Sequence, residues 1–118
     1  MQYILLIYNN EAERTGRSQS EHEKVFAEHQ QFNGEITKSG HKLGGQPLEA
    51  STTATTVRVK NGKILRTDGP FAETREQLAG FYLVEAKDLD EAVSLAVRVP
   101  DARFGSVEVR PIMKMPGM

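Results

Sequence analysis

The sequence predicts an α+β fold in which two helices cover one face of an antiparallel sheet. Two segments combine helical spacing with capping residues, four short apolar segments have the length of strands, and Asn61-Gly62 joins two β-branched segments. In chain order these elements read β-α-β-(β-hairpin)-β-α-β. This is the split βαβ order of ferredoxin-like domains, with an extra hairpin.

The first strand is expected over residues 2–8, which are apolar on both faces, and residues 9–17 are expected to form a polar loop. Ser18 and Ser20 each start a capping-box pattern, so a helix begins near one of them and runs to about Lys38, where Gly40 ends it. Four of its residues share one face at helical spacing, and Phe26 widens that stripe. The four are Val25, His29, Phe32 and Ile36.

The middle of the chain predicts strands. Asn61-Gly62 is a strong hairpin signal between β-branched segments, and Asp68-Gly69-Pro70 predicts a turn. The expected strands cover residues 41–48, 53–60, 63–67 and 80–85.

The second helix is expected to start at an Asp88 cap and to reach about Val99, where Pro100 stops it. The last strand is expected over residues 107–113. The side chains expected to point inward from this helix are Leu89, Ala92, Val93 and Ala96.

The length and composition of the chain exclude several classes of protein. A chain of 118 residues is one domain, expected over residues 1–113 with a short tail over 114–118. The lack of cysteine excludes disulfide scaffolds, zinc ribbons and thiol catalysis. The near balance of 15 basic and 16 acidic residues argues against nucleic acid as a partner. The apolar run at residues 3–8 is too short to be a signal peptide or to span a membrane. We therefore expect a cytoplasmic protein without a membrane partner.

Two helices can cover only one face of the sheet, yet the first strand and residues 81–84 are apolar on both faces. An antiparallel sheet with one face in water should alternate apolar and polar residues instead. We therefore expect a homodimer that packs sheet against sheet. The alternatives are an exposed apolar patch or a ligand cavity in a monomer.

His29 lies within the apolar stripe of the first helix, where an imidazole costs free energy unless its ring nitrogens are hydrogen-bonded. It is a candidate general acid or base at a cavity between helix and sheet. The alternative is a structural histidine bonded to a backbone carbonyl.

Two further places hold candidate site residues. Asp68-Gly69-Pro70 makes a rigid turn that projects Phe71 toward the core or a pocket, and Asp68 or Glu73 could orient His29 or contact a substrate. Turn chemistry and a solvated acidic loop are the alternative. On the last strand, Arg110 could bind a carboxylate substrate or pair with Glu108.

The three histidines have no spacing typical of a metal site, since Phe26 stands where an HExxH motif needs its second histidine. Gly44-Gly45 lacks the spacing of a nucleotide-binding loop. We therefore expect no metal and no cofactor.

Residues 67–74 (TDGPFAET) and 76–82 (EQLAGFY) resemble the signature of the DGPF-domain branch of the YCII-related family. The similarity covers nearly the whole chain. It implies a YciI-like dimeric α+β barrel, and an acid–base site in which His29 matches the helix histidine. The broader family pairs that histidine with an Asp before Pro near the end of the second helix. Here the order is Pro100-Asp101, and the branch motif offers Asp68 instead.

The leading hypothesis is a cofactor-independent enzyme, or an enzyme-like binding protein, for a small organic molecule. His29 and Asp68 would be the acid–base pair of an isomerase- or lyase-type reaction. Substrate contacts would come from Phe71, Glu73, Tyr82 and Arg110. The resemblance also implies a rival, a non-catalytic accessory module associated with an extracytoplasmic-function sigma factor. A dimer that senses a ligand without turnover is a third hypothesis.

Overall fold

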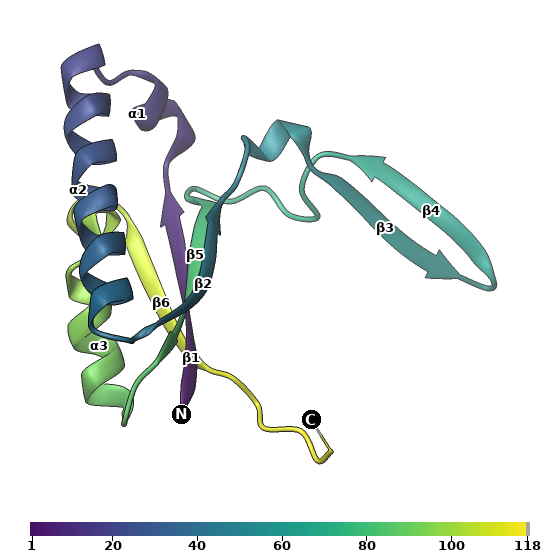
Figure 1. Ribbon diagram of the computed structural model, residues 1–118. Helices are drawn as coiled ribbons and strands as arrows, with labels where there is room; N and C mark the ends of the chain where they lie inside the picture. The colour runs from purple at the N-terminus through teal and green to yellow at the C-terminus, as the bar shows by residue number, and fades with distance from the viewer. Residues whose placement is uncertain (118) are drawn as a thin grey trace.

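The computed structural model describes residues 1–117 and shows one four-stranded antiparallel sheet with helices on one of its faces (Figure 1). The strand order β2-β5-β1-β6 is that of a ferredoxin-like domain, so the predicted fold class is confirmed. Met118, at the end of the expected tail, lies outside the described residues. The strands are β1 (Gln2–Asn9), β2 (Lys42–Pro47), β5 (Gln77–Glu85) and β6 (Ser106–Pro111).

Helix α2 (Gln19–Lys38) begins at the first of its two candidate caps. The side chain of Ser18 accepts a hydrogen bond from the backbone N–H of Glu21, which satisfies a donor that the first turn would leave unpaired. The helix ends where Gly40 adopts a φ of 81°, a conformation that glycine reaches without steric cost. Its buried residues are Phe32 and Ile36.

Residues 9–17, expected as a polar loop, contain the short helix α1 (Glu11–Thr15). The side chain of Asn10 accepts from the N–H of Glu13 and so caps this turn. The sequence signal was missed because α1 buries no side chain and shows no apolar stripe. Helix α1 lies near the N-terminal end of α2 (Figure 1).

Helix α3 (Leu89–Val97) starts at the predicted Asp88 cap, whose side chain accepts from the N–H of Glu91. Its inward face differs from the prediction, because Leu89 and Val93 are exposed. The helix buries Ala92, Leu95 and Ala96, and Val99 continues this face into the turn that follows. Pro100 stops the helix as expected and opens the 3₁₀ helix η2 (Pro100–Arg103).

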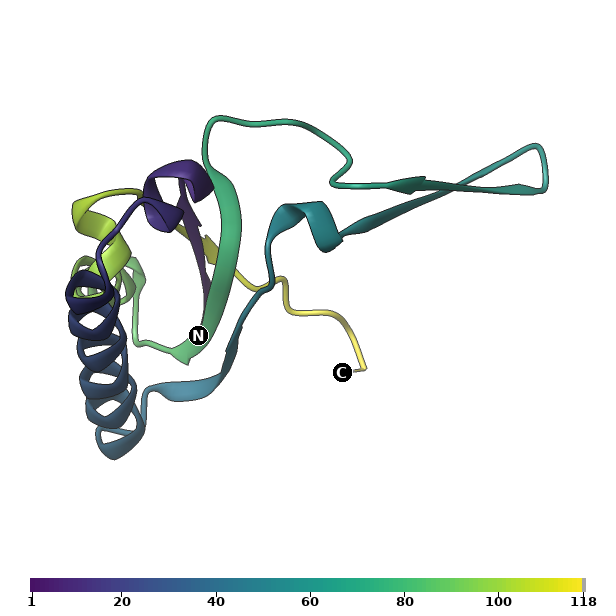
Figure 2. The same cartoon turned by 90° about the horizontal axis from the view of Figure 1, so that it is seen from above.

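The core lies between the helices and the face of the sheet that they cover (Figure 2). Alternate residues of β1 point into it, and Phe32 and Ile36 of α2 pack against them together with α3. The buried β1 residues are Tyr3, Leu5, Ile7 and Asn9.

No α-helix covers the opposite face of the sheet (Figure 2). The register pairs Ile4 with Leu83 and Leu6 with Phe81, so these side chains share the face that Leu5 does not. Tyr8 follows on the same side of β1. All five are only partly buried within the chain. We call these five residues the open face.

Strands β3 (Thr55–Lys60) and β4 (Lys63–Asp68) form a separate two-stranded sheet, here called the arm. A short 3₁₀ helix, η1 (Ser51–Thr53), precedes it. The arm projects away from the body on the side of the open face (Figures 1 and 2). Asn61 and Gly62 have φ values of 51° and 76°, as a tight two-residue hairpin turn requires.

Within residues 1–117, no helix is both long enough and apolar enough to cross a membrane.

Candidate functional site

Both ring nitrogens of His29 have side-chain partners. Nε2 lies 2.6 Å from Oδ1 of Asp101, and Nδ1 lies 3.1 Å from the hydroxyl oxygen of Tyr82. His29 comes from the middle of α2, Tyr82 from β5 and Asp101 from η2, so three elements converge here. Neither partner is a backbone carbonyl, which distinguishes this arrangement from that of a purely structural histidine.

Asp101 is held firmly, with 4% of its surface exposed. Its second oxygen, Oδ2, accepts a hydrogen bond of 2.8 Å from the side-chain amide of Asn9, at the end of β1. Its backbone carbonyl accepts from the N–H of Gly105 at 2.7 Å. Pro100 at the start of η2 restricts the turn that carries Asp101. The carboxylate therefore reaches His29 from a fixed position.

The environment sets the protonation states of both partners of His29. Burial alone would raise the pKa of Asp101, but hydrogen bonds from His29 and Asn9 outweigh burial and lower that pKa below its ordinary value. Burial, followed by the charge of Asp101, raises the pKa of Tyr82. At neutral pH Asp101 is therefore a carboxylate and Tyr82 a protonated phenol.

These states define the direction of each hydrogen bond. A carboxylate can only accept, so Nε2 of His29 carries the hydrogen that is shared with Asp101. In the neutral imidazole Nδ1 is then an acceptor, and the Tyr82 hydroxyl donates to it. The result is a chain of hydrogen bonds from Tyr82 through His29 to Asp101.

The tyrosine ring is fixed by its neighbours. It packs edge-on against Phe32, with ring centroids 5.2 Å apart and an interplanar angle of 80°. It lies nearly parallel to the imidazole of His29, at an angle of 19° and a centroid distance of 6.4 Å. Packing on both sides leaves the hydroxyl little freedom to leave Nδ1.

The three residues line a cavity of about 700 Å³ between α2 and the strands β2 and β5. This volume is within the range of small-molecule binding sites. One wall is the face of α2 that carries His22, Val25, Phe26 and His29, and the opposite wall includes Leu48. Although Phe26 is largely exposed, it contributes to the helix wall as the widened stripe predicts.

Two amide oxygens on the cavity wall are buried and accept no hydrogen bond from the described residues. They are Oδ1 of Asn9 and Oδ1 of Asn33, one turn of α2 beyond His29. A buried acceptor without a partner costs about 1–3 kcal/mol. These atoms are therefore candidate contacts for a hydrogen-bond donor.

Of the residues expected to contact substrate, Tyr82 lies in the cavity and the others lie elsewhere. Phe71 is 80% exposed, and Glu73 is also exposed in the segment that follows the arm. Arg110 forms an ion pair with Glu108 on the exposed side of β6, which was the alternative expected for it. None of these three lines the cavity.

Asp68 is not the partner of His29 in this chain. It pairs with Thr55 at the base of the arm, and the N–H of Gly69 bonds to the carbonyl of Ala54. The rigid turn thus anchors a hairpin that projects from the body. Asp101 occupies the position beside His29 that was expected for Asp68.

Sequence reasoning set Asp101 aside in favour of Asp68, and it missed Asn9. The available signal for Asp101 was an acid directly after the proline that ends the second helix, although in the reverse of the order found in the wider family. Asn9 had a weaker signal, a polar residue at the inward-facing end of an apolar strand. Its contact with Asp101 spans 92 residues and could not be inferred from local pattern.

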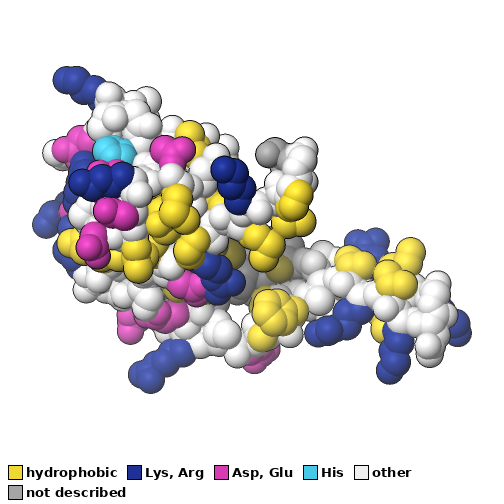
Figure 3. All heavy atoms as spheres, turned by 90° about the horizontal axis from the view of Figure 1, so that it is seen from below, with side chains coloured by type: hydrophobic (Ala, Val, Ile, Leu, Met, Phe, Trp, Pro, Cys, Tyr) yellow, Lys and Arg dark blue, Asp and Glu magenta, His cyan; other side chains and the backbone are white. Residues whose placement is uncertain are grey.

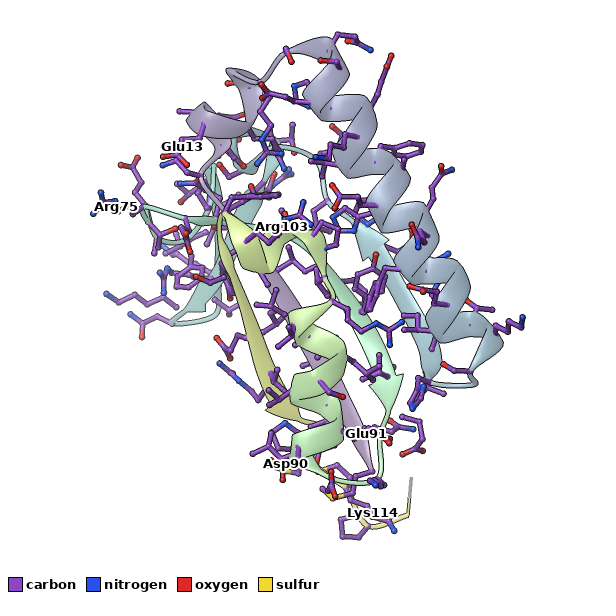
Figure 4. The ribbon with its side chains drawn as sticks, turned by 90° about the vertical axis from the view of Figure 1, so that its left-hand side faces the viewer. Glu13, Arg75, Asp90, Glu91, Arg103 and Lys114 are labelled. Atoms are coloured by element: carbon purple, nitrogen blue, oxygen red, sulfur yellow. The ribbon has the colours of Figure 1, made fainter. Side chains whose placement is uncertain are left out.

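The other histidines do not join this centre. His41 is paired with Glu91 at a distance of 3.3 Å, and Figure 4 shows Glu91 near the start of α3, at the end of the helix layer away from Arg103. Within the described residues no group of three or more His, Cys, Asp or Glu side chains is arranged to hold a metal ion.

The low pKa of Asp101 predicts an acid-sensitive contribution to stability. The folded pKa lies below the ordinary 3.8, so the carboxylate stabilises the fold above that pH and loses its contribution as the pH falls through the folded value. We expect Asp101→Asn to lower the free energy of unfolding at pH 7 by about 1–3 kcal/mol. The deficit should shrink in acid below the pKa of the unfolded chain.

Urea unfolding of both proteins at neutral pH and in acid measures this difference. Glu49→Gln, at an exposed position, provides the control for loss of one negative charge. A deficit that is the same at both pH values would contradict the assigned role of the carboxylate.

The fold and site define a small α+β protein with a histidine–aspartate pair in a cavity between helix and sheet. Residues 1–116 match the YCII-related domain. An uncharacterized protein, R00369, of Rhizobium meliloti (strain 1021) is 40% identical over 115 residues, which are 95% of this chain and 92% of that protein. The chain belongs to the YCII-related family.

Proposed function

We propose that this chain is a cofactor-independent acid–base catalyst that moves a proton beside a carbonyl group of a small organic molecule. The observation that carries the proposal is the imidazole of His29, bonded to a buried carboxylate on one nitrogen and to a phenol on the other, at the wall of a cavity. A single histidine oriented by an acid is sufficient for isomerisation or elimination.

The hydrogen-bonded chain suggests the route of the proton. A substrate C–H proton passes to the Tyr82 oxygen while the Tyr82 proton passes to Nδ1 of His29. The electron pair of the C–H bond forms the carbon–carbon double bond of an enolate, and the carbonyl oxygen takes the negative charge. His29 becomes an imidazolium ion, which the Asp101 carboxylate stabilises. Return of the proton at another carbon completes an isomerisation, and departure of a leaving group completes an elimination.

Two observations favour this function over a non-catalytic accessory module. Such a module predicts a filled core around a histidine bonded to a backbone carbonyl. The side-chain partners of His29 and the adjacent cavity fit an acid–base site instead. A ligand sensor without turnover would share the cavity, so a rate measurement separates it from an enzyme.

The test uses phenylpyruvate, whose benzylic protons lie beside a carbonyl. Exchange of these protons in D₂O can be followed by NMR with and without the protein. Catalysed exchange that depends on His29 supports the proposal. If a panel of such carbonyl compounds exchanges at the buffer rate in the presence of the protein, the acid–base function is contradicted.

We also propose that two copies of the chain associate through their open faces. The support is the apolar character of Ile4, Leu6 and Phe81 on a face that no helix covers. A second sheet packed on this face would remove all five open-face side chains from water and form a two-sheet core.

The exposed side chains of the arm also favour a second copy of the chain as the partner. An isolated two-stranded hairpin is marginally stable in water, and one face of this arm exposes Val57, Val59 and Ile64 (Figure 3). Residues 55–68 contain four basic side chains and one acidic one, whereas the rest of the chain contains eleven basic and fifteen acidic residues. The arm is thus complementary in charge to the body of another copy. We further propose that the chain belongs to the DGPF branch of its family, with the motif at the base of the arm, residues 67–74, as the support.

A further inference from the structure

The cavity wall carries more basic than acidic side chains. Asp101 is the one acidic residue among those that line it, and this carboxylate is already bonded to His29 and Asn9. Three basic residues line the same cavity: Arg14, Arg17 and Lys42. The wall therefore carries excess positive charge although the whole chain has a net charge of −1.

These three basic side chains also lack acidic partners within residues 1–117. The ion pairs there use other cations, such as Arg98 with Glu35 and Arg103 with Glu28. None of them involves the three basic residues on the cavity wall. Positive charge that lines a concave surface and is not neutralised attracts anions from solution.

Arg17 is held close to the acid–base centre. Its guanidinium lies 4.0 Å from the centroid of the Phe104 ring, a cation–π contact. Phe104 follows η2, and its N–H bonds to the carbonyl of Asp101. Arg14 comes from α1, which Glu13 marks in Figure 4, near the N-terminal end of α2. Both arginines are only partly exposed.

Apart from His22, the α2 wall that precedes His29 is apolar. Val25 and Phe26 lie on the α2 wall one turn before His29, and Leu48 also lines the cavity. One turn of α-helix spans about 5 Å along its axis. A ligand that reaches from the arginines to His29 therefore needs an apolar body of a few carbon atoms.

We propose that the cavity binds an organic carboxylate, with its anionic group at Arg14 and Arg17 and its apolar body along Val25 and Phe26. The planar guanidinium groups can donate paired hydrogen bonds to a carboxylate. Lys42 adds to the positive potential of the same cavity. Only the placement of the reacting carbon beside His29 and Tyr82 rests on the proposed acid–base function.

The test compares two probes of the same shape, 3-phenylpropanoate and the neutral 3-phenylpropanamide. Binding to the full chain is followed by NMR shifts of backbone amides. We expect the carboxylate to shift amides of α2 and β2 and to bind at least about tenfold more tightly than the amide. The double variant Arg14→Gln/Arg17→Gln should remove this preference while retaining the binding of the amide.

Arg66→Gln on the arm is the matched control, because it removes one arginine charge away from the cavity, and it should leave the preference intact. Inorganic phosphate at equal ionic strength serves as a third probe. The proposal is overturned by any of four results: equal binding of the two phenyl probes, an unchanged preference in the double variant, phosphate binding as tight as that of the carboxylate, or no binding of either phenyl probe.

The binding test does not depend on whether the protein catalyses proton exchange. Equal binding of the two phenyl probes by the unmodified protein, with intact proton exchange, would reject the ligand class and leave the acid–base function standing. A preserved preference without any exchange would reject the acid–base function alone.

Discussion

Replacing His29 by glutamine is expected to lower the protein-catalysed exchange of phenylpyruvate protons by about 10²–10⁴-fold, the usual contribution of a positioned acid or base. Glutamine can keep a hydrogen bond to Asp101 or to Tyr82, but its amide does not accept a proton near neutral pH. The rate constant at saturating phenylpyruvate, measured by NMR in D₂O, gives the size of the effect.

The matched control is His41→Gln, the same substitution at a histidine that pairs with Glu91 outside the cavity. It should leave the exchange rate within about twofold of that of the original protein, as expected for a surface change away from the site. If His29→Gln and His41→Gln exchanged phenylpyruvate at equal rates, the imidazole of His29 would have no part in the chemistry.

Replacing Leu6 by lysine is expected to convert a dimer into a monomer. Leu6 is central on the open face, where it pairs with Phe81 on β5 and with Glu108 on β6. Glu108 already pairs with Arg110, so a lysine charge buried there would lack a free partner. Such a charge costs several kcal/mol per copy, and a symmetric interface would contain it twice. Light scattering coupled to gel filtration measures the mass directly.

Val97→Lys is the control, since Val97 is 68% exposed at the end of α3 on the helix-covered side of the sheet. It should leave the dimer intact. A monomeric mass for the unmodified protein, or a dimer that survives Leu6→Lys, would contradict association through the open face.

The fold could be predicted from sequence because its signals are local. Ser18 and Asp88 cap their helices within three residues, and Asn61-Gly62 fixes the hairpin turn by itself. The inward face of α3 could not be predicted correctly, since Leu89 and Val93 also lie at helical spacing. Which face of a short apolar helix is buried depends on how it packs against the sheet, and no single segment encodes this.

The site could be predicted only in part, because its contacts join distant segments. His29 was identifiable from the cost of an imidazole on an apolar stripe. Its partner Asp101 is 72 residues away along the chain, and its local signal, an acid directly after Pro100, is weaker than the conspicuous motif that contains Asp68. The Asp68-Gly69-Pro70 turn in that motif instead anchors the arm.

The central claim is that His29 and Asp101 act as one acid–base unit, and a double-mutant cycle tests it most directly. Exchange of phenylpyruvate is measured for His29→Gln, Asp101→Asn and the variant carrying both. If the two residues act together, the double variant should be no slower than His29→Gln alone, because Asp101 works only through the imidazole. Losses that multiply in the double variant would show independent roles and contradict the account.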